Sequence, residues 1–194
     1  NSHLIISIGN WVLQKACEQA QRWAKQYNRH LLFSINVSPM QFSHNNFYLN
    51  FKKTLETYKY PADYLSIEIT ESMLMEDSEE VSQGLKNIDE LGVRISLDDF
   101  GMGYSSLSRL QSLPIDTLKI DKLFVADIHN ENEKVVIIDT IITLAHELGM
   151  SIIAEGIENE EQLNYLIAKN CTLGQGFLLN KPLSMEDFEK IAYS

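Results

Sequence analysis

Two adjacent carboxylates, Asp98 and Asp99, are the residues of this chain with the clearest capacity for chemistry. They follow an apolar segment that contains Val93, Ile95 and Leu97, and they precede a glycine-punctuated loop. Neighbouring carboxylates repel each other and lose hydration when partly buried, so a positive group usually compensates them. At the carboxyl end of a parallel strand, that group is typically a metal ion or a phosphate-bearing substrate with its metal. The alternative is a turn or a helix cap, where aspartate is common.

Polar side chains also mark the other places where a strand is expected to end. In chain order they are Asn36, Glu68 with Glu71 just beyond it, the Asp98–Asp99 pair, Lys119 with Asp121, Glu155 and Gln175. In a barrel of parallel strands all carboxyl ends face one mouth, where active sites are built. Six strands that each deliver such a residue favour a functional site there over a merely solvated rim.

The ligand types at these positions indicate which chemistry the site could support. Carboxylate and amide oxygens are hard donors that suit Mg²⁺, Mn²⁺ or Ca²⁺. A carboxylate cluster of this size could hold two metals for a phosphoryl displacement, and Lys119 could hold the attacking water or neutralise a phosphate oxygen. An ordinary ion pair of Lys119 with Asp116 or Asp121 is the alternative. The five histidines show no paired metal spacing, and no Ser-His-Asp or Cys-His arrangement is visible.

Helical and strand patterns alternate along the whole chain, which indicates an α/β fold with a parallel sheet. Strands are expected over residues 30–37, 65–70, 93–98, 117–120, 151–154 and 171–174, and helices over residues 5–27, 47–58, 79–91, 106–113, 133–148, 160–169 and 185–193. A closed (β/α) barrel needs eight strands, whereas this pattern gives six. Either an N-terminal part of a barrel lies outside these residues, or the sheet is open.

Composition narrows the class of protein. The chain has 194 residues and a net charge of −11, which argues against binding to DNA or another nucleic-acid backbone. Cys17 and Cys171 lie far apart in no metal-binding or redox spacing, as expected of free thiols in the cytoplasm. No apolar run approaches the roughly 20 residues of a membrane span.

Several motifs occur together in an order that matches one known family. They are Asn36-Val37-Ser38 with Gln41-Phe42, Glu68-Ile69-Thr70-Glu71-Ser72, Asp98-Asp99-Phe100-Gly101 with Gly103-Tyr104-Ser105-Ser106, Leu118-Lys119-Ile120-Asp121, Ala154-Glu155-Gly156-Ile157-Glu158, Gln175-Gly176-Phe177 and Lys181-Pro182. With these motifs the chain resembles the EAL-type cyclic di-GMP phosphodiesterases of bacteria, over essentially all of its length.

The resemblance implies a TIM-like (β/α)8 barrel, with about six of its eight strand–helix units in these 194 residues as a single domain. It implies a two-metal site for Mg²⁺ or Mn²⁺ and cleavage of cyclic di-GMP to linear pGpG in second-messenger signalling. Asn36, Glu68 and Asp98 would bind the first metal, and Asp98 would bridge to a second one that Asp99 and Glu155 also bind.

Further roles follow from the same resemblance. Lys119 would hold the nucleophilic water. Glu71 would anchor the loop from Phe100 to Ser106, in which Gly101 and Gly103 are the conspicuous residues. Asp121 would contact the substrate, and Glu158 and Gln175 would support the site or bind the substrate. The expected partners are cyclic di-GMP, a second copy of the chain, and upstream sensor or GGDEF-type domains of a parent protein that could be anchored in a membrane.

Two departures from the family pattern have consequences. The Glu-Ala-Leu motif does not occur in this sequence, and Met102 stands where threonine is usual between the two loop glycines. We expect the motif on a strand N-terminal to Asn1, so that full activity belongs to the intact parent and these residues alone are impaired. The alternatives are a catalytically inactive domain that binds cyclic di-GMP or a partner protein, and a generic sugar-phosphate barrel enzyme.

Overall fold

A computed structural model describes residues 2–75, 78–101, 107–128 and 133–193. Along these residues each strand is followed by a helix. The chain divides into two compact units, the first made of Asn1–Asp98 and Gly103–Asp116 and the second of Asp99–Met102 and Thr117–Ser194. Each unit builds its own set of parallel strands, as the alternating sequence pattern predicts.

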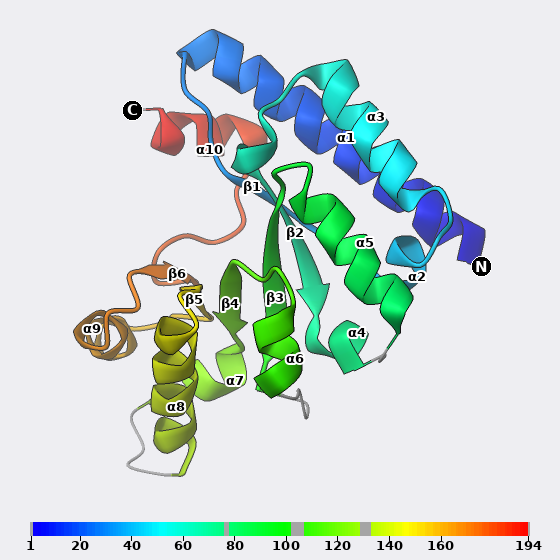
Figure 1. Ribbon diagram of the computed structural model, residues 1–194. Coiled ribbons are helices and arrows are strands. Elements are labelled where there is room, and N and C mark those ends of the chain that lie inside the picture. Colours follow the sequence, from blue (N-terminus) through cyan, green and yellow to red (C-terminus); the bar gives the residue numbers. More distant parts are fainter. Residues whose placement is uncertain (1, 76–77, 102–106, 129–132, 194) are drawn as a thin grey trace. The chain divides into compact units, whose positions relative to one another are not determined.

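Three parallel strands in the order β1-β2-β3 form the sheet of the first unit (Figure 1). Its elements are α1 (Ser2–Tyr27), β1 (Phe33–Asn36), α2 (Pro39–Phe42), α3 (Phe47–Tyr58), a 3-10 turn (Ala62–Tyr64), β2 (Leu65–Thr70), α4 (Glu71–Met75), α5 (Glu79–Asp89), β3 (Arg94–Phe100) and α6 (Leu107–Ser112). The register sets Asn36 beside Glu68, and Asp98 beside Thr70.

The two faces of this sheet differ in character because side chains alternate along a strand. Serines, Asn36, Glu68 and Asp98 share one face, and a buried hydrogen bond of 2.9 Å joins the Ser66 and Ser96 hydroxyls there. The opposite face carries apolar side chains that are fully buried, among them Ile67 and Ile95. The alternation therefore buries one face in the core and gives the polar site residues the other.

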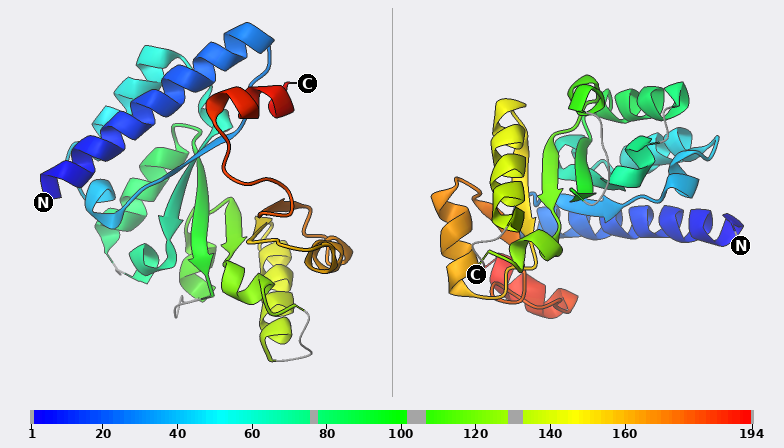
Figure 2. Two further views of the ribbon diagram at one scale, coloured as in Figure 1. Left: turned by 180° about the vertical axis from the view of Figure 1, so that it is seen from behind. Right: turned by 90° about the horizontal axis from the view of Figure 1, so that it is seen from below.

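The second unit orders its parallel strands β4-β5-β6, and α8 lies alongside β4 and β5 (Figures 1 and 2). Its elements are β4 (Thr117–Ile120), α7 (Lys122–Val125), α8 (Glu133–Glu147), β5 (Ser151–Glu155), α9 (Glu160–Ala168), β6 (Leu173–Gln175) and α10 (Met185–Ala192). Ile138, Ala145 and Ala154 are fully buried in this unit, whereas the three residues of β6 are exposed.

Predicted element boundaries are confirmed for several segments and shifted for others. Strand β3 continues past its predicted end at Asp98 to Phe100, so Asp99 also belongs to the strand rather than to the turn after it. Strand β1 is shorter than predicted, and β6 begins two residues later than predicted and ends on Gln175. Helices α2, α4 and α7 were not predicted, because four or five residues contain too little of a helical period to be recognised.

In the part of the chain that the structure describes, no helix is both long and apolar enough to cross a membrane. This agrees with the absence of a long apolar run in the sequence.

A polar network joins α8 to α9. Both Asp139 oxygens accept bonds of 2.6 Å, one from the Tyr165 hydroxyl and the other from the Lys169 ammonium. Partial burial alone would raise the pKa of Asp139, but the hydrogen bonds from Lys169 and Tyr165 outweigh it and hold that pKa below its ordinary value. The network therefore stabilises the packing of the two helices only while Asp139 is ionised.

We expect Asp139→Asn to lower the urea midpoint at pH 7. Because the pKa of this aspartate is lowered on folding, its contribution is present above the unfolded-state value of about 4 and is lost as the pH falls through the folded-state pKa. The difference between variant and wild type should therefore narrow in acid. Tyr165→Phe, which keeps the Lys169 ion pair, is the milder control. A difference that stays constant from pH 7 to pH 2.5 would contradict this assignment.

A second test concerns the core of the first unit. Leu85 in α5 is fully buried, whereas Leu49 in α3 is 61% exposed. Leu85→Ala should cost about 2–5 kcal/mol of unfolding free energy, because it removes buried methyl groups and leaves a cavity. Leu49→Ala should cost less than about 0.5 kcal/mol. Urea denaturation followed by circular dichroism measures both, and equal costs would contradict the placement of α5.

Candidate functional site

The first unit brings Asn36, Glu68 and Asp98 to the carboxyl ends of three neighbouring strands. Asn36 and Glu68 are direct neighbours in the parallel register, and all three side chains belong to the polar face of the sheet. Asn36 is exposed and the other two are partly buried. Asp98 has one carboxylate oxygen, Oδ1, that is inaccessible to solvent. Two carboxylates and an amide oxygen at one sheet edge form a donor set suited to a hard divalent cation.

That donor set is small. Among the described residues, no group of three His, Cys, Asp or Glu side chains has the arrangement of a metal site. Glu68 and Asp98 are two acids, and their third neighbour Asn36 contributes an amide. The set therefore fits a cation in the chemistry of its oxygens, and further ligands would have to complete the coordination shell.

Glu71 lies immediately after β2, as the first residue of α4, and is only 4% exposed. A carboxylate so buried belongs to the structure around it rather than to a solvated rim. Of the loop that the sequence associates with Glu71, Phe100 is buried and Gly101 has a φ of +100°. A Cβ on Gly101 would lie 2.8 Å from the Phe124 ring, so glycine is required there. Met102 and Gly103 lie outside the described residues.

Lys119 and Glu155 form the best-defined contact of the second unit. The Lys119 ammonium lies 2.6 Å from Glu155 Oε1, and the two side chains are 5% and 17% exposed. Lys119 pairs in register with Ile153, so Glu155 is its diagonal neighbour on the same face. A buried ammonium needs such a partner, because an unpaired charge in the interior is costly.

Gln175 completes this cluster. Its side-chain amide donates to the same Glu155 Oε1 at 2.9 Å, and the two residues are direct neighbours in the register of β5 and β6. We use "Glu155 cluster" for Lys119, Glu155 and Gln175. The sequence predicted that all three lie at strand ends, but not that they contact one another.

Three other predicted site residues have local structural features of their own. Asp121 caps α7, since its Oδ1 accepts from the Leu123 amide at 2.7 Å. Glu158 is exposed, and its amide donates to Gln162 Oε1 at 2.8 Å. Asp99 is exposed and has a φ of +54°, a left-handed conformation in which aspartate is tolerated better than most residues.

The alternative partners considered for Lys119 are not the contact that the structure shows. Asp116 Oδ2 accepts from the Ile95 amide at 2.7 Å, and Asp121 is the helix cap of α7. The ion pair with Glu155 is the one that defines the surroundings of Lys119.

A cavity of about 500 Å³ opens beside the Glu155 cluster within the second unit. Its lining includes Glu155 and Gln175, two cations, Lys122 and Lys181, and the aromatic ring of Phe177. Phe177 is 62% exposed, and the Lys181 ammonium lies 5.7 Å from the centre of its ring. An exposed ring beside two cations and an amide can take a planar group that carries a phosphate. Sequence reasoning had not assigned Phe177 to a site, although an aromatic residue two positions after Gln175 is the signal that could have found it.

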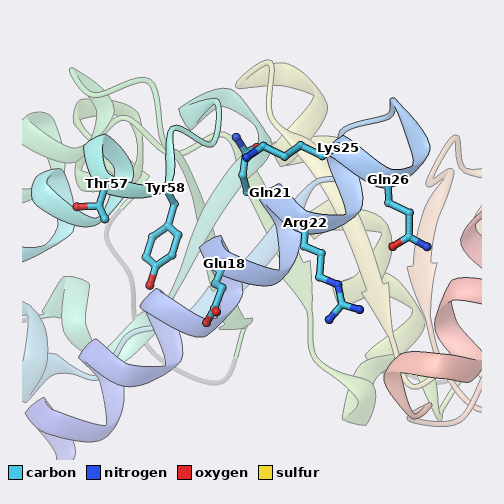
Figure 3. Close-up of a pocket in the computed structure, with 7 residues that line it drawn as sticks. All are labelled: Glu18, Gln21, Arg22, Lys25, Gln26, Thr57 and Tyr58. Carbon is cyan, nitrogen blue, oxygen red and sulfur yellow. The ribbon is translucent and has the colours of Figure 1, made fainter.

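Another cavity, of about 570 Å³, lies between α1 and α3 in the first unit (Figure 3). Its lining residues are Glu18, Gln21, Arg22, Lys25, Gln26, Thr57 and Tyr58. These residues come from the C-terminal parts of two helices that lead into the beginnings of β1 and β2. The cavity is therefore at the end of the strands opposite to the predicted site, where side chains usually serve stability.

Both cysteines are buried and unpaired with each other, and burial raises the pKa of each thiol to about 11. Such thiols stay protonated at neutral pH and are poor nucleophiles or metal ligands. This confirms the interpretation of Cys17 and Cys171 as ordinary free thiols.

Comparison with known proteins connects this geometry to a family. The model of the EAL domain matches residues 1–182. The chain is 43% identical over 188 residues to signaling protein YkoW of Bacillus subtilis, and this alignment spans 96% of the chain and 23% of YkoW. It is 33% identical over 189 residues to cyclic di-GMP phosphodiesterase PdeR of Escherichia coli, across 97% of the chain and 28% of PdeR. The chain thus spans about a quarter of the length of these curated relatives.

Comparison with solved structures leads to the same family. The PaMucR phosphodiesterase in complex with c-di-GMP superposes with a TM-score of 0.92 at 35% identity, over 96% of this chain and 75% of that one. The EAL domain of Mycobacterium smegmatis DcpA gives 0.90 at 37% identity, over 96% of this chain and 84% of that one. The fold is accordingly the TIM-like barrel type, and the six parallel strands with their helices are part of such a barrel. The chain belongs to the EAL domain family.

Proposed function

We propose that the native protein carrying this chain hydrolyses one phosphodiester bond of cyclic di-GMP and releases linear pGpG. One observation carries the proposal: in an EAL domain, the oxygen donors Asn36, Glu68 and Asp98 lie side by side at strand ends. A relative across 97% of the chain is named a cyclic di-GMP phosphodiesterase, and a structural relative holds c-di-GMP.

Divalent metals are part of the proposal. Asn36, Glu68 and Asp98 would hold one cation, and Asp99 and Glu155 would serve a second; hard oxygen ligands favour Mg²⁺ or Mn²⁺. A bound cation of this kind lowers the pKa of a coordinated water and neutralises charge on the phosphate. Lys119 would orient the attacking water through its ammonium protons, or stabilise charge that develops on a phosphate oxygen.

Glu71 would anchor the loop that begins at Phe100, in which Gly101 and Gly103 are the glycines that the family resemblance singles out. Two observations support this assignment. The carboxylate of Glu71 is buried, and position 101 requires glycine. Asp121 would contact the substrate, and Glu158 and Gln175 would support the site or the substrate, as the family resemblance suggests.

Partners and location complete the proposal. MucR of Pseudomonas aeruginosa is named a bifunctional diguanylate cyclase and cyclic di-GMP phosphodiesterase, and DosP of Escherichia coli an oxygen sensor protein. We infer a parent protein of the same kind, with sensor or GGDEF-type domains, that acts in the bacterial cytoplasm as a homodimer. Binding to DNA is not part of the function, given the net charge of −11.

The decisive variant is Glu68→Gln, which keeps the shape of the side chain and removes its charge. In the native protein with Mg²⁺ or Mn²⁺ we expect pGpG formation to fall at least about 100-fold, because a cation ligand is lost. Chromatography of the nucleotide products measures this. Glu56→Gln in α3, an exposed carboxylate on the same unit, is the matched control and should leave the rate unchanged.

Two results would contradict the proposal. Binding of cyclic di-GMP without any metal-dependent product in the wild type would make the domain a receptor. A wild-type rate that Glu68→Gln leaves intact would remove the carboxylate set from the chemistry.

The cavity of the second unit gives a separate prediction. Phe177→Ala should weaken binding of cyclic di-GMP about 5- to 150-fold, since stacking of a base on an aromatic ring contributes about 1–3 kcal/mol. Calorimetry with Ca²⁺ in place of the activating metal measures affinity without turnover. Leu179→Ala, an exposed apolar residue two positions further on, is the control. Equal affinities for Phe177→Ala and wild type would exclude the ring as a base platform.

A further inference from the structure

The side chain of Gln175 and the ammonium of Lys119 both contact a single atom, Oε1 of Glu155. From this we propose that Gln175 is a positioning residue for Glu155: together with Lys119 it fixes the rotation of the carboxylate and so directs its second oxygen toward a cation. This inference rests on the proposed metal-dependent function. It makes specific a role that the family resemblance left open between support of the site and contact with the substrate.

The backbone holds Gln175 in the place that this role requires. Its carbonyl accepts from the Ile157 amide at 3.1 Å, and the Ile157 carbonyl accepts from the Leu178 amide at 3.0 Å. A Cβ on Gly176 would come within 2.1 Å of that Ile157 carbonyl, so only glycine permits this approach. Main-chain bonds at Gln175 and at Leu178 thus tie the end of β6 and the residues after it to Ile157, which follows β5.

Charge and burial explain why two donors are needed. Lys119, 5% exposed, supplies the charge that balances Glu155. A single contact to a flexible lysine still lets the carboxylate rotate about its terminal bond. The neutral amide of Gln175, approaching the same oxygen from the neighbouring strand, removes that freedom without adding a charge. Groups that hydrogen-bond a ligating carboxylate typically change metal affinity 10- to 100-fold.

The test compares Gln175→Ala with Asn180→Ala, another polar residue of the same cavity. With the native protein, Mn²⁺ affinity is measured by calorimetry, and KM for cyclic di-GMP is measured at saturating Mn²⁺. Gln175→Ala should weaken Mn²⁺ binding about 10-fold and change KM less than twofold. Asn180→Ala should leave Mn²⁺ binding unchanged. A raised KM for Gln175→Ala with unchanged Mn²⁺ affinity would overturn the proposal.

A double-mutant cycle shows whether Gln175 acts through Glu155. On a Glu155→Gln background, adding Gln175→Ala should cause no further loss of Mn²⁺ affinity; a full additional loss would overturn the proposal. Because Glu155→Gln leaves Lys119 buried beside a neutral amide, the same cycle is repeated on a Lys119→Met/Glu155→Gln background, where neither member of this pair is charged.

The cycle is also measured without metal, as the coupling between positions 155 and 175 in urea midpoints with EDTA. If the wild type neither binds Mn²⁺ nor cleaves cyclic di-GMP, the proposed function fails. The coupling in urea midpoints still shows whether Gln175 holds Glu155. A coupling of zero would show that Gln175 does not hold Glu155. A positive coupling together with normal Mn²⁺ binding by Gln175→Ala would confine the contact to stability and overturn the positioning role.

Discussion

The ion pair between Lys119 and Glu155 is the interaction on which the arrangement of the Glu155 cluster depends. An ammonium at 4% exposure within β4 is tolerable only if an anion lies beside it, and Glu155 on β5 provides that anion at 2.6 Å. Removing one partner of a buried pair typically costs about 3–5 kcal/mol, because the other charge stays buried without compensation. The pair therefore constrains how β4 and β5 align, and it places both reactive groups on the same face of the strands.

A simpler constraint orders the first unit. Each of its strands alternates an apolar residue with a small or polar one. The face that is buried in the core therefore determines the direction of every other side chain of the strand. Once Ile67 and Ile95 are buried, the faces of Glu68 and Asp98 follow, since side chains an odd number of residues away point to the other face of a strand. The serines that precede them, Ser66 and Ser96, satisfy each other's hydroxyl groups. The functional edge is thus a by-product of the way in which the core is packed.

Much of this was predictable from the sequence, for physical reasons that differ between elements. Helix α3 and strands β2 and β4 begin and end where their hydrophobic periodicity and the flanking turn residues predict. The partner of Lys119 was not predictable in this way, because Glu155 is far along the chain and Asp116 and Asp121 are nearer. Both of these aspartates bind backbone amides instead, at Ile95 and Leu123. Nearness in sequence favoured them as partners of Lys119, but in the structure their carboxylates accept from these two backbone amides.

The segment Gly174-Gln175-Gly176 has a consequence for how faithfully β6 must pair with β5. If the strand slipped by one position in either direction, a glycine would stand beside Glu155, and neither glycine has a side chain with which to donate a hydrogen bond. A slipped strand would therefore lose the hydrogen bond to Glu155 completely rather than weaken it. Only the observed register of β6 against β5 thus allows the contact between Gln175 and Glu155, which makes the contact a sensitive indicator of correct strand pairing.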